Sequence, residues 1–253
     1  MRPSMPPLVF LHGWGQSSRI WQHQADHFRR FAPVLTPQLP GHGGAAEAPP
    51  EAWLETLAAG LPDKPAVLVG WSLGGMLALE LAHGFPERVA ALALVSTTPC
   101  FRARDDWPHG CADATFRAFE QAVRAHSPKA LARFFALMLQ GDALPRSRTN
   151  ELARHYIDRE HPPTAGALAG GLALLAMLDL RRQLPHIKQP VWVAHGDHDA
   201  IIPAAAGHDL AGQLPHAAWH RFDACGHAPF LTQAEDFQQR LEAWCRNIST
   251  ANG

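Results

Sequence analysis

One stretch, V-L-V-G-W-S-L-G-G-M-L at residues 67–77, restricts the folds open to this chain more than any other part of the sequence. The apolar run before Gly70 is typical of a short buried strand, whereas Met76–His83 contains no helix breaker and is typical of a buried helix. A strand that passes into a helix over so few residues requires a sharp turn. Because glycine has no Cβ, Gly70 and Gly74 let strand and helix approach each other closely at this turn.

Ser72 lies on the turn between these two glycines, in the pattern Gly-x-Ser-x-Gly. In the nucleophile elbow of α/β hydrolases, this pattern holds the serine in a strained backbone conformation and presents its hydroxyl at the edge of the sheet. The pattern also arises by chance, and a serine in a turn is often only a small polar residue. The strand predicted before Ser72 and the helix predicted after it favour a nucleophile.

Five further apolar runs predict strands that alternate with helical stretches: Leu8–Leu11, Val34–Thr36, Val89–Ser96, Val191–Ala194 and Ala218–Phe222. This alternation predicts an α/β fold, with a mostly parallel twisted sheet, helices on both faces and a ligand site at the carboxyl ends of the strands. Four helical segments interrupt it: Thr115–Ala125, Ala130–Leu139, Arg148–Ile157 and Ala167–Leu180. We therefore expect a helical cap at 109–180, inserted into a core formed by 1–108 and 181–253.

Composition excludes several classes of protein. The 253 residues suffice for one large domain with an insert, and a formal net charge of −1 provides no general attraction to nucleic acid, membranes or acidic polymers. The four cysteines show neither C-x-x-C pairing nor zinc spacing. The first residues are too poor in apolar side chains for a signal peptide, and no run approaches the roughly 18 apolar residues of a membrane span. We expect a cytoplasmic monomer.

A serine hydroxyl is a weak nucleophile and needs a base, which in turn needs a group that sets its tautomer. Of the 16 histidines, His227 follows the last predicted strand and precedes the final predicted helix, Glu235–Cys245. His12 and His42 also follow strands, but they precede Ser72, whereas hydrolases of this kind have the order serine, acid, histidine. His227 is therefore the predicted base.

The predicted acid lies in H-G-D-H-D at residues 195–199, directly after a predicted strand. Asp197 and Asp199 are both candidates. We favour Asp199, because it lies further from the strand and can reach sideways toward His227, and we expect Asp197 to tighten the turn. The segment is rich in metal-ligand types but lacks the spacing of a metal site, so we expect no metal and no cofactor.

Two backbone amides are the predicted oxyanion hole. Leu73 follows the nucleophile at a helix N-terminus, where amides have no helical partner, and Trp14 lies in the loop H-G-W-G at 12–15. The alternative for H-G-W-G is a tight turn with no role in binding.

With these parts located, the chain resembles the α/β-hydrolase superfamily through four motifs: H-G-W-G, G-W-S-L-G-G at 70–75, the turn at Asp199, and G-H-A-P-F at 226–230. Over nearly its full length it also resembles the pimeloyl-[acyl-carrier protein] methyl ester esterases of biotin synthesis. The narrower resemblance rests on Trp71, on P-C-F-R-A-R-D-D-W-P at 99–108, and on the segment from G-G-L at 170–172 to D-L-R at 179–181.

This resemblance implies a serine esterase that hydrolyses the methyl ester of a pimeloyl group held on acyl carrier protein, with release of methanol. The residues expected to bind the acyl chain are Trp14, Trp71, Phe134, Phe135, Met138 and Phe230. Met138 stands where the family pattern has glutamine. A surface that docks the acidic carrier is expected from Arg124, Lys129, Arg133, Arg146, Arg148 and Arg154, which outnumber the acidic residues of the same stretch by four.

The same serine, histidine and aspartate also fit a broad-specificity carboxylesterase or a hydrolase of carbon–carbon bonds acting on an unrelated small acid. A receptor that has kept the fold without catalysis is a third alternative, since a fold does not determine a function.

Overall fold

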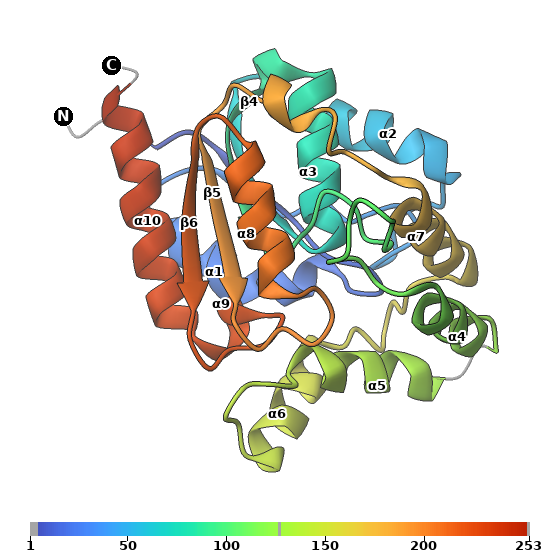
Figure 1. Cartoon of the computed structure of the whole chain (residues 1–253). Helices are drawn as coiled ribbons and strands as arrows, with labels where there is room; N and C mark the ends of the chain where they lie inside the picture. Colours follow the sequence, from blue (N-terminus) through green and yellow to red (C-terminus); the bar gives the residue numbers. More distant parts are fainter. Residues whose placement is uncertain (1–4, 126–127, 252–253) are drawn as a thin grey trace.

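A single sheet of six parallel strands organises the computed structural model, which describes residues 5–125 and 128–251 (Figure 1). The strands are β1 (Leu8–Leu11), β2 (Val34–Leu35), β3 (Ala66–Trp71), β4 (Val89–Val95), β5 (Val191–Gly196) and β6 (Ala217–Phe222). Their order across the sheet is β2-β1-β3-β4-β5-β6, and each neighbouring pair is parallel. The predicted α/β architecture is confirmed.

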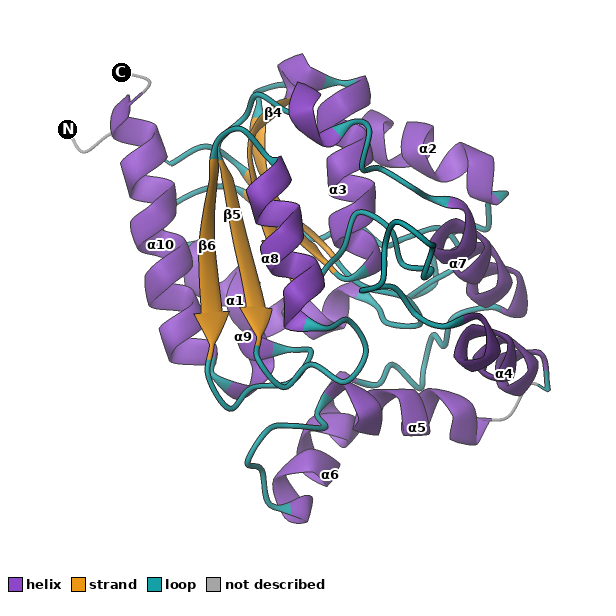
Figure 2. Cartoon of the chain, viewed as in Figure 1, coloured by secondary structure: helices purple, strands orange, loops and turns teal. Residues whose placement is uncertain are grey.

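Helices cover both faces of this sheet, because successive residues of a strand point to opposite sides. In β1, Val9 and Leu11 belong to one apolar cluster, and Leu8 and Phe10 belong to another. The first cluster includes side chains of α2 (Trp53–Ala59), α3 (Leu73–Gly84) and α8 (Ala204–Gln213). The second includes side chains of α1 (Gln22–Phe28) and α10 (Ala234–Ala251), on the other face (Figure 2).

Short helical turns complete the connections. They are η1 (Ser18–Trp21), η2 (Pro50–Ala52), η3 (Pro86–Arg88), η4 (Leu184–His186) and α9 (Pro229–Thr232). The sequence does not predict α1 or α2, because each has only seven residues and therefore too few turns to show a helical period.

Four helices lie between β4 and β5 in the described part of the chain: α4 (Asp113–Arg124), α5 (Pro128–Met138), α6 (Arg146–Tyr156) and α7 (Ala165–Met177). The carboxyl ends of β5 and β6 point toward the side of the molecule where α5 and α6 lie (Figure 1). α7 packs closely on the sheet domain, since a Cβ on Gly170 would lie 3.4 Å from the Trp53 ring. We propose that 109–180 form a cap on a core of 1–108 and 181–253.

The turn between β3 and α3 depends on its glycines. A Cβ on Gly70 would overlap the carbonyl oxygen of Gly74, and a Cβ on Gly74 would overlap the carbonyl oxygens of Leu11 and His12 in the neighbouring strand and loop. Because these obstacles are backbone atoms, they cannot turn aside as a flexible side chain would. Glycine at both positions therefore allows the close strand-to-helix approach.

We expect Gly74→Ala to lower the free energy of unfolding by roughly 3 kcal/mol, because the added methyl group forces the turn away from β1. Gly84→Ala is the matched control, because Gly84 ends the same helix and a Cβ there would meet nothing within 4 Å. The control should be neutral or stabilising by up to about 1 kcal/mol. Urea denaturation measures both. Equal stability of the two variants would contradict the proposed packing of the turn.

Candidate active site

Ser72 lies at the carboxyl end of β3 in a strained backbone conformation, with φ of 55° and ψ of −120°. Positive φ is uncommon for residues other than glycine and costs on the order of 1–3 kcal/mol, so the surroundings must impose it. The Ser72 amide donates to Val95 O at 3.0 Å, and Thr97 Oγ1 donates to Ser72 O at 2.7 Å. The last residue of β4 therefore holds the amide of Ser72, and Thr97, two residues further on, holds its carbonyl.

His227 and Asp199 are hydrogen-bonded in the interior. His227 Nδ1 lies 2.7 Å from Asp199 Oδ2, and both side chains are buried. The backbone of His227 is also held: its amide donates to Met138 O at 2.9 Å, and its carbonyl accepts from Trp71 Nε1 at 2.8 Å. The imidazole therefore has a defined position between the end of α5 and the residue that precedes Ser72.

Asp199 is an ionised acceptor with several donors. Its Oδ1 accepts from the amides of Ile201 at 2.8 Å and Ile202 at 3.0 Å. Burial acts to raise the pKa of Asp199, but His227 and His195 outweigh burial and bring that pKa below its ordinary value. The carboxylate can therefore fix the tautomer of His227 with the proton on Nδ1, leaving Nε2 as the basic nitrogen.

His227 Nε2 is buried and has no hydrogen-bond partner among the residues that the structure describes. Ser72 Oγ is not hydrogen-bonded to it, although the Trp71 ring lies 5.3 Å from the imidazole, centroid to centroid. Catalytic hydrogen bonds are often long in the absence of substrate and shorten when it binds. The structure thus places Ser72 and His227 at the same end of the sheet, with an unused acceptor on the imidazole.

The two amides predicted to hold the oxyanion are available. Neither Trp14 N nor Leu73 N donates a hydrogen bond to another residue in the described part of the chain. The loop that carries Trp14 packs against the turn, since a Cβ on Gly13 would lie 3.2 Å from Ser72 Cβ. Both donors therefore lie beside the serine, as an oxyanion hole requires.

His12 supports this loop as a neutral side chain. Its Nδ1 lies 2.9 Å from Gly13 O, and its Nε2 accepts from the amide of Leu39 at 3.1 Å. Burial lowers the pKa of His12 to about 3, with a smaller contribution from His42. His12 therefore joins the loops after β1 and β2 without placing a positive charge there.

The side chains expected to bind the acyl chain occupy two different places. The Trp14 ring is in edge contact with Phe134 at 5.0 Å and with Phe119 at 4.9 Å, and its Nε1 donates to Leu168 O at 2.9 Å. Sequence analysis did not identify Phe119. Phe119 lies on α4, three residues after Phe116 and four before Val123. This helical spacing puts the three apolar side chains on one face of the helix, and it was the sequence signal for Phe119.

The other four expected residues are completely or almost completely buried: Trp71, Phe135, Met138 and Phe230. Trp71 is in edge contact with Phe230 at 5.2 Å, and Phe230 stacks on Trp21 at 4.0 Å. These aromatic rings support the loop around His227.

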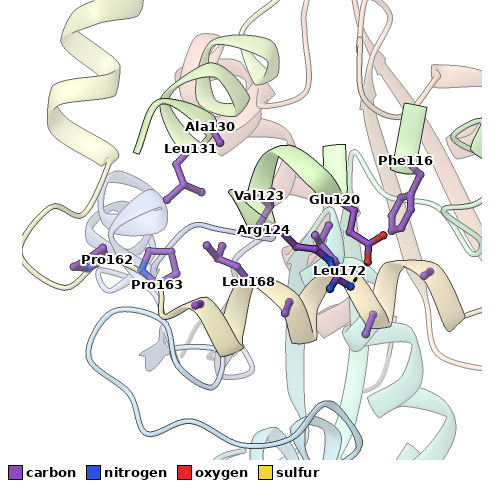
Figure 3. A pocket seen from close by; sticks show the side chains of 14 residues that line it. Phe116, Glu120, Val123, Arg124, Ala130, Leu131, Pro162, Pro163, Leu168 and Leu172 are labelled. Carbon is purple, nitrogen blue, oxygen red and sulfur yellow. Dashed lines mark hydrogen bonds and ion pairs between the residues drawn. The ribbon is translucent and has the colours of Figure 1, made fainter. Parts of the chain in front are cut away.

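A cavity of about 620 Å³ lies between α4, α5 and α7 (Figure 3). Its apolar wall includes Phe116, Val123, Leu131, Leu168 and Leu172, none of which the sequence led us to expect as acyl-binding. None of the six expected acyl-binding residues lines it. The helix α7, which lines this cavity, also packs against the candidate site, because a Cβ on Gly171 would contact both Trp14 and Leu73.

The remaining residues of H-G-D-H-D have separate partners. Asp197 Oδ1 accepts from the amide of Cys225 at 3.2 Å, and His198 Nδ1 lies 3.2 Å from Gly141 O in the cap. Asp197 thus braces the turns after β5 and β6. Within residues 5–125 and 128–251, no group of three or more histidine, cysteine or carboxylate side chains could hold a metal ion, and no helix is long and apolar enough to cross a membrane.

With this geometry, comparison with known proteins places the chain in a class. Residues 6–234 match the family described as alpha/beta hydrolase fold, and the chain belongs to that family. A solved esterase from Exiguobacterium antarcticum has the same fold, with a TM-score of 0.85, 21% identity, and coverage of 96% of this chain and 93% of that one.

Two curated relatives narrow the assignment. One from Aromatoleum aromaticum is 45% identical over 245 residues, which is 94% of this chain and 97% of the relative. Another from Nitrosomonas europaea is 38% identical over 241 residues, which is 94% and 95% respectively. Both are named pimeloyl-[acyl-carrier protein] methyl ester esterase. The chain belongs to this family of esterases within the α/β hydrolases.

Proposed function

We propose that this protein hydrolyses the methyl ester of pimeloyl-[acyl-carrier protein], a step of biotin synthesis, through Ser72, His227 and Asp199. The observation that carries the proposal is the buried 2.7 Å bond between His227 and Asp199 at the end of the sheet where Ser72 has its strained conformation. The relatives' names supply the substrate.

The mechanism follows from these positions. His227 Nε2 takes the Ser72 proton as Oγ attacks the ester carbonyl, and the amides of Trp14 and Leu73 donate to the oxygen that becomes negative. The imidazolium then gives its proton to the departing methoxide, and methanol leaves. Water repeats the sequence on the acyl-enzyme, with His227 again as base, and releases the free acid. Asp199 stays ionised throughout and stabilises the imidazolium.

The apolar surface around Trp14 supplies room for the methylene chain. The Trp14 ring makes edge contacts with Phe119 and Phe134, and the cavity wall at Leu168 and Leu172 continues this surface along α7. Burying methylene groups there contributes about 0.8 kcal/mol for each group. An acyl chain is therefore favoured over a compact, polar acid.

The basic surface of the cap suits an acidic carrier protein. Arg133, Arg146 and Arg154 are exposed and make no ion pair with another described residue. Asp142, one of the two acidic residues of this stretch, is half-buried, with Oδ2 inaccessible to solvent, and it faces the loop at Gly226. It therefore compensates little of the surface charge.

The other members of the expected docking surface contribute less. Arg148 pairs with Glu151 at 2.8 Å, and Arg124 pairs with Glu120 at 3.0 Å. Lys129 belongs to α5, but its side chain lies outside the described residues. The candidate docking surface is therefore centred on Arg133, Arg146 and Arg154.

Reversing Arg133 and Arg146 to glutamate should lower kcat/KM for the carrier-bound methyl ester at least roughly tenfold at low salt, because like charges then repel the carrier. Added salt should shrink the difference, since it screens exposed charges. Hydrolysis of p-nitrophenyl butyrate should change less than about twofold, because this small ester needs no docking. Methanol release and nitrophenolate absorbance measure the two reactions.

The double variant Lys64→Glu and Lys188→Glu is the matched control. Both lysines are exposed and lie just before β3 and β5, at the end of the sheet opposite the candidate site. The control changes the net charge equally and should leave both reactions unaltered. An equal loss on both substrates in the arginine variant, or none on either, would favour a broad-specificity carboxylesterase. Binding of the carrier-bound ester without turnover by the unmodified protein would favour a receptor.

A further inference from the structure

A second histidine contacts the carboxylate that orients His227. His195 Nε2 lies 3.1 Å from Asp199 Oδ2, the same oxygen that accepts from His227 Nδ1. His195 is the fifth residue of β5 and has no exposed surface. One carboxylate oxygen is therefore shared by two buried imidazoles.

The tautomer of His195 follows from its partners. Its Nε2 also lies 2.9 Å from Ile202 O, so both neighbours of this nitrogen are acceptors. Nε2 must therefore carry a hydrogen, which it shares between the Ile202 carbonyl and the Asp199 carboxylate. Its Nδ1 is buried and has no hydrogen-bond partner among the described residues.

This arrangement is costly for a residue that only fills space. A buried nitrogen without a partner loses its bond to water, and an apolar side chain of similar size would not incur that loss. What the imidazole adds is a fourth donor to Asp199, after the amides of Ile201 and Ile202 and the Nδ1 of His227.

We propose that His195 is a positioning residue for the reaction. By donating to Asp199 Oδ2, it orients the carboxylate toward His227 and limits how strongly that carboxylate stabilises the imidazolium form of His227. The proposal rests on the proposed function only in requiring Ser72, His227 and Asp199 to act together. It does not depend on the carrier or on the acyl group.

Neighbouring elements pack against the Nδ1 side of the His195 ring, whereas Asp199 contacts its Nε2. Gly207 of α8 lies against the ring, because a Cβ there would overlap His195 Nδ1, and the Trp219 ring of β6 lies 6.2 Å away, centroid to centroid. The titratable groups around the shared carboxylate are His195 and His227, which contact it, and Asp142 and Cys225, which lie further away.

The test compares pH profiles of kcat/KM for p-nitrophenyl butyrate. His195→Leu removes the donor, whereas His195→Gln keeps an N–H near the position of Nε2. With one donor fewer, Asp199 stabilises the imidazolium form of His227 more strongly. We therefore expect the acidic limb of the kcat/KM profile of His195→Leu to move up by roughly half a pH unit to one unit. Its kcat/KM at neutral pH should fall roughly tenfold. His195→Gln should restore the midpoint of the limb and most of the rate.

A second pair of variants leaves His195 itself unchanged. Gly207→Ala displaces the imidazole from behind and should move the acidic limb in the same direction by a smaller amount. Gly212→Ala in the same helix is its control, because a Cβ there would meet nothing within 4 Å, and it should match the unmodified protein. If His195→Leu does not fold, the comparison of Gly207→Ala with Gly212→Ala tests the proposal.

Two results would overturn the proposal. One is a lowered rate in His195→Leu or Gly207→Ala with no movement of the acidic limb, which indicates packing alone. The other is a His195→Gln variant as impaired as His195→Leu. Failure of the proposed function looks different, because the unmodified protein would then not hydrolyse the nitrophenyl ester or would hydrolyse it independently of Ser72.

Discussion

Ser72→Ala should reduce ester hydrolysis by a factor of roughly 10⁴ or more, because the side-chain oxygen that forms the acyl-enzyme is lost. The melting temperature should stay close to that of the unmodified protein. Alanine meets the same positive φ as serine, and the hydrogen bonds at this position involve only the backbone of Ser72. Nitrophenyl ester turnover and thermal unfolding by circular dichroism measure the two quantities.

Ser96→Ala is the matched control. Ser96 directly follows the neighbouring strand β4, is fully buried and also has a positive φ, of 44°. Its hydroxyl has no hydrogen-bond partner among the described residues, so its removal should change turnover by less than about twofold. Unchanged turnover in Ser72→Ala would exclude the proposed nucleophile, and a loss shared by both variants would point to the fold of the strand ends.

The second large effect is expected from Asp199→Asn, which should lower kcat by a factor of roughly 10⁴. If the amide oxygen keeps the backbone donors of Ile201 and Ile202, the NH₂ group faces His227 Nδ1. His227 then adopts the tautomer with the proton on Nε2 and cannot accept the proton of Ser72. The remaining acidic limb should move to lower pH, because an amide does not stabilise the imidazolium.

Asp197→Asn provides the control two residues away on the same turn. Its Oδ1 accepts from the amide of Cys225, and an asparagine oxygen can accept that hydrogen bond equally well. We expect its kcat to stay within about twofold of the unmodified value. A large loss in Asp197→Asn with little change in Asp199→Asn would assign the acid to the other carboxylate.

The sequence predicted most of the sheet, because the signals involved are local. Most of the strands are short apolar runs, and the runs at 8–11, 67–69 and 191–194 are each followed by a glycine within two residues. The turn at Ser72 was predicted for the same reason, since Gly70 and Gly74 must lie beside it along the chain. The helices α1 and α2 were missed because two turns do not establish a period.

Side-chain partners were harder to predict. Asp142 counted as a surface charge in the sequence, yet it turns inward toward the loop at Gly226. Trp71 was expected to bind the acyl chain, and the structure shows its ring buried and its Nε1 donating to the carbonyl of His227. The roles of Ser72, Asp199 and His227 in catalysis stay predictions, for which the variants above are the test.

The sequence by itself therefore determined the class of fold, the turn that carries Ser72 and the short set of residues able to act with it. These follow from apolar period, from glycine and from the order of motifs along the chain. Only the tertiary structure decided that His195 shares the carboxylate of Asp199, that Trp71 holds a residue 156 positions away, and that the cavity lies between cap helices. Such contacts depend on how β5, β6 and the cap pack against one another, and the spacing of residues along the chain does not determine this packing.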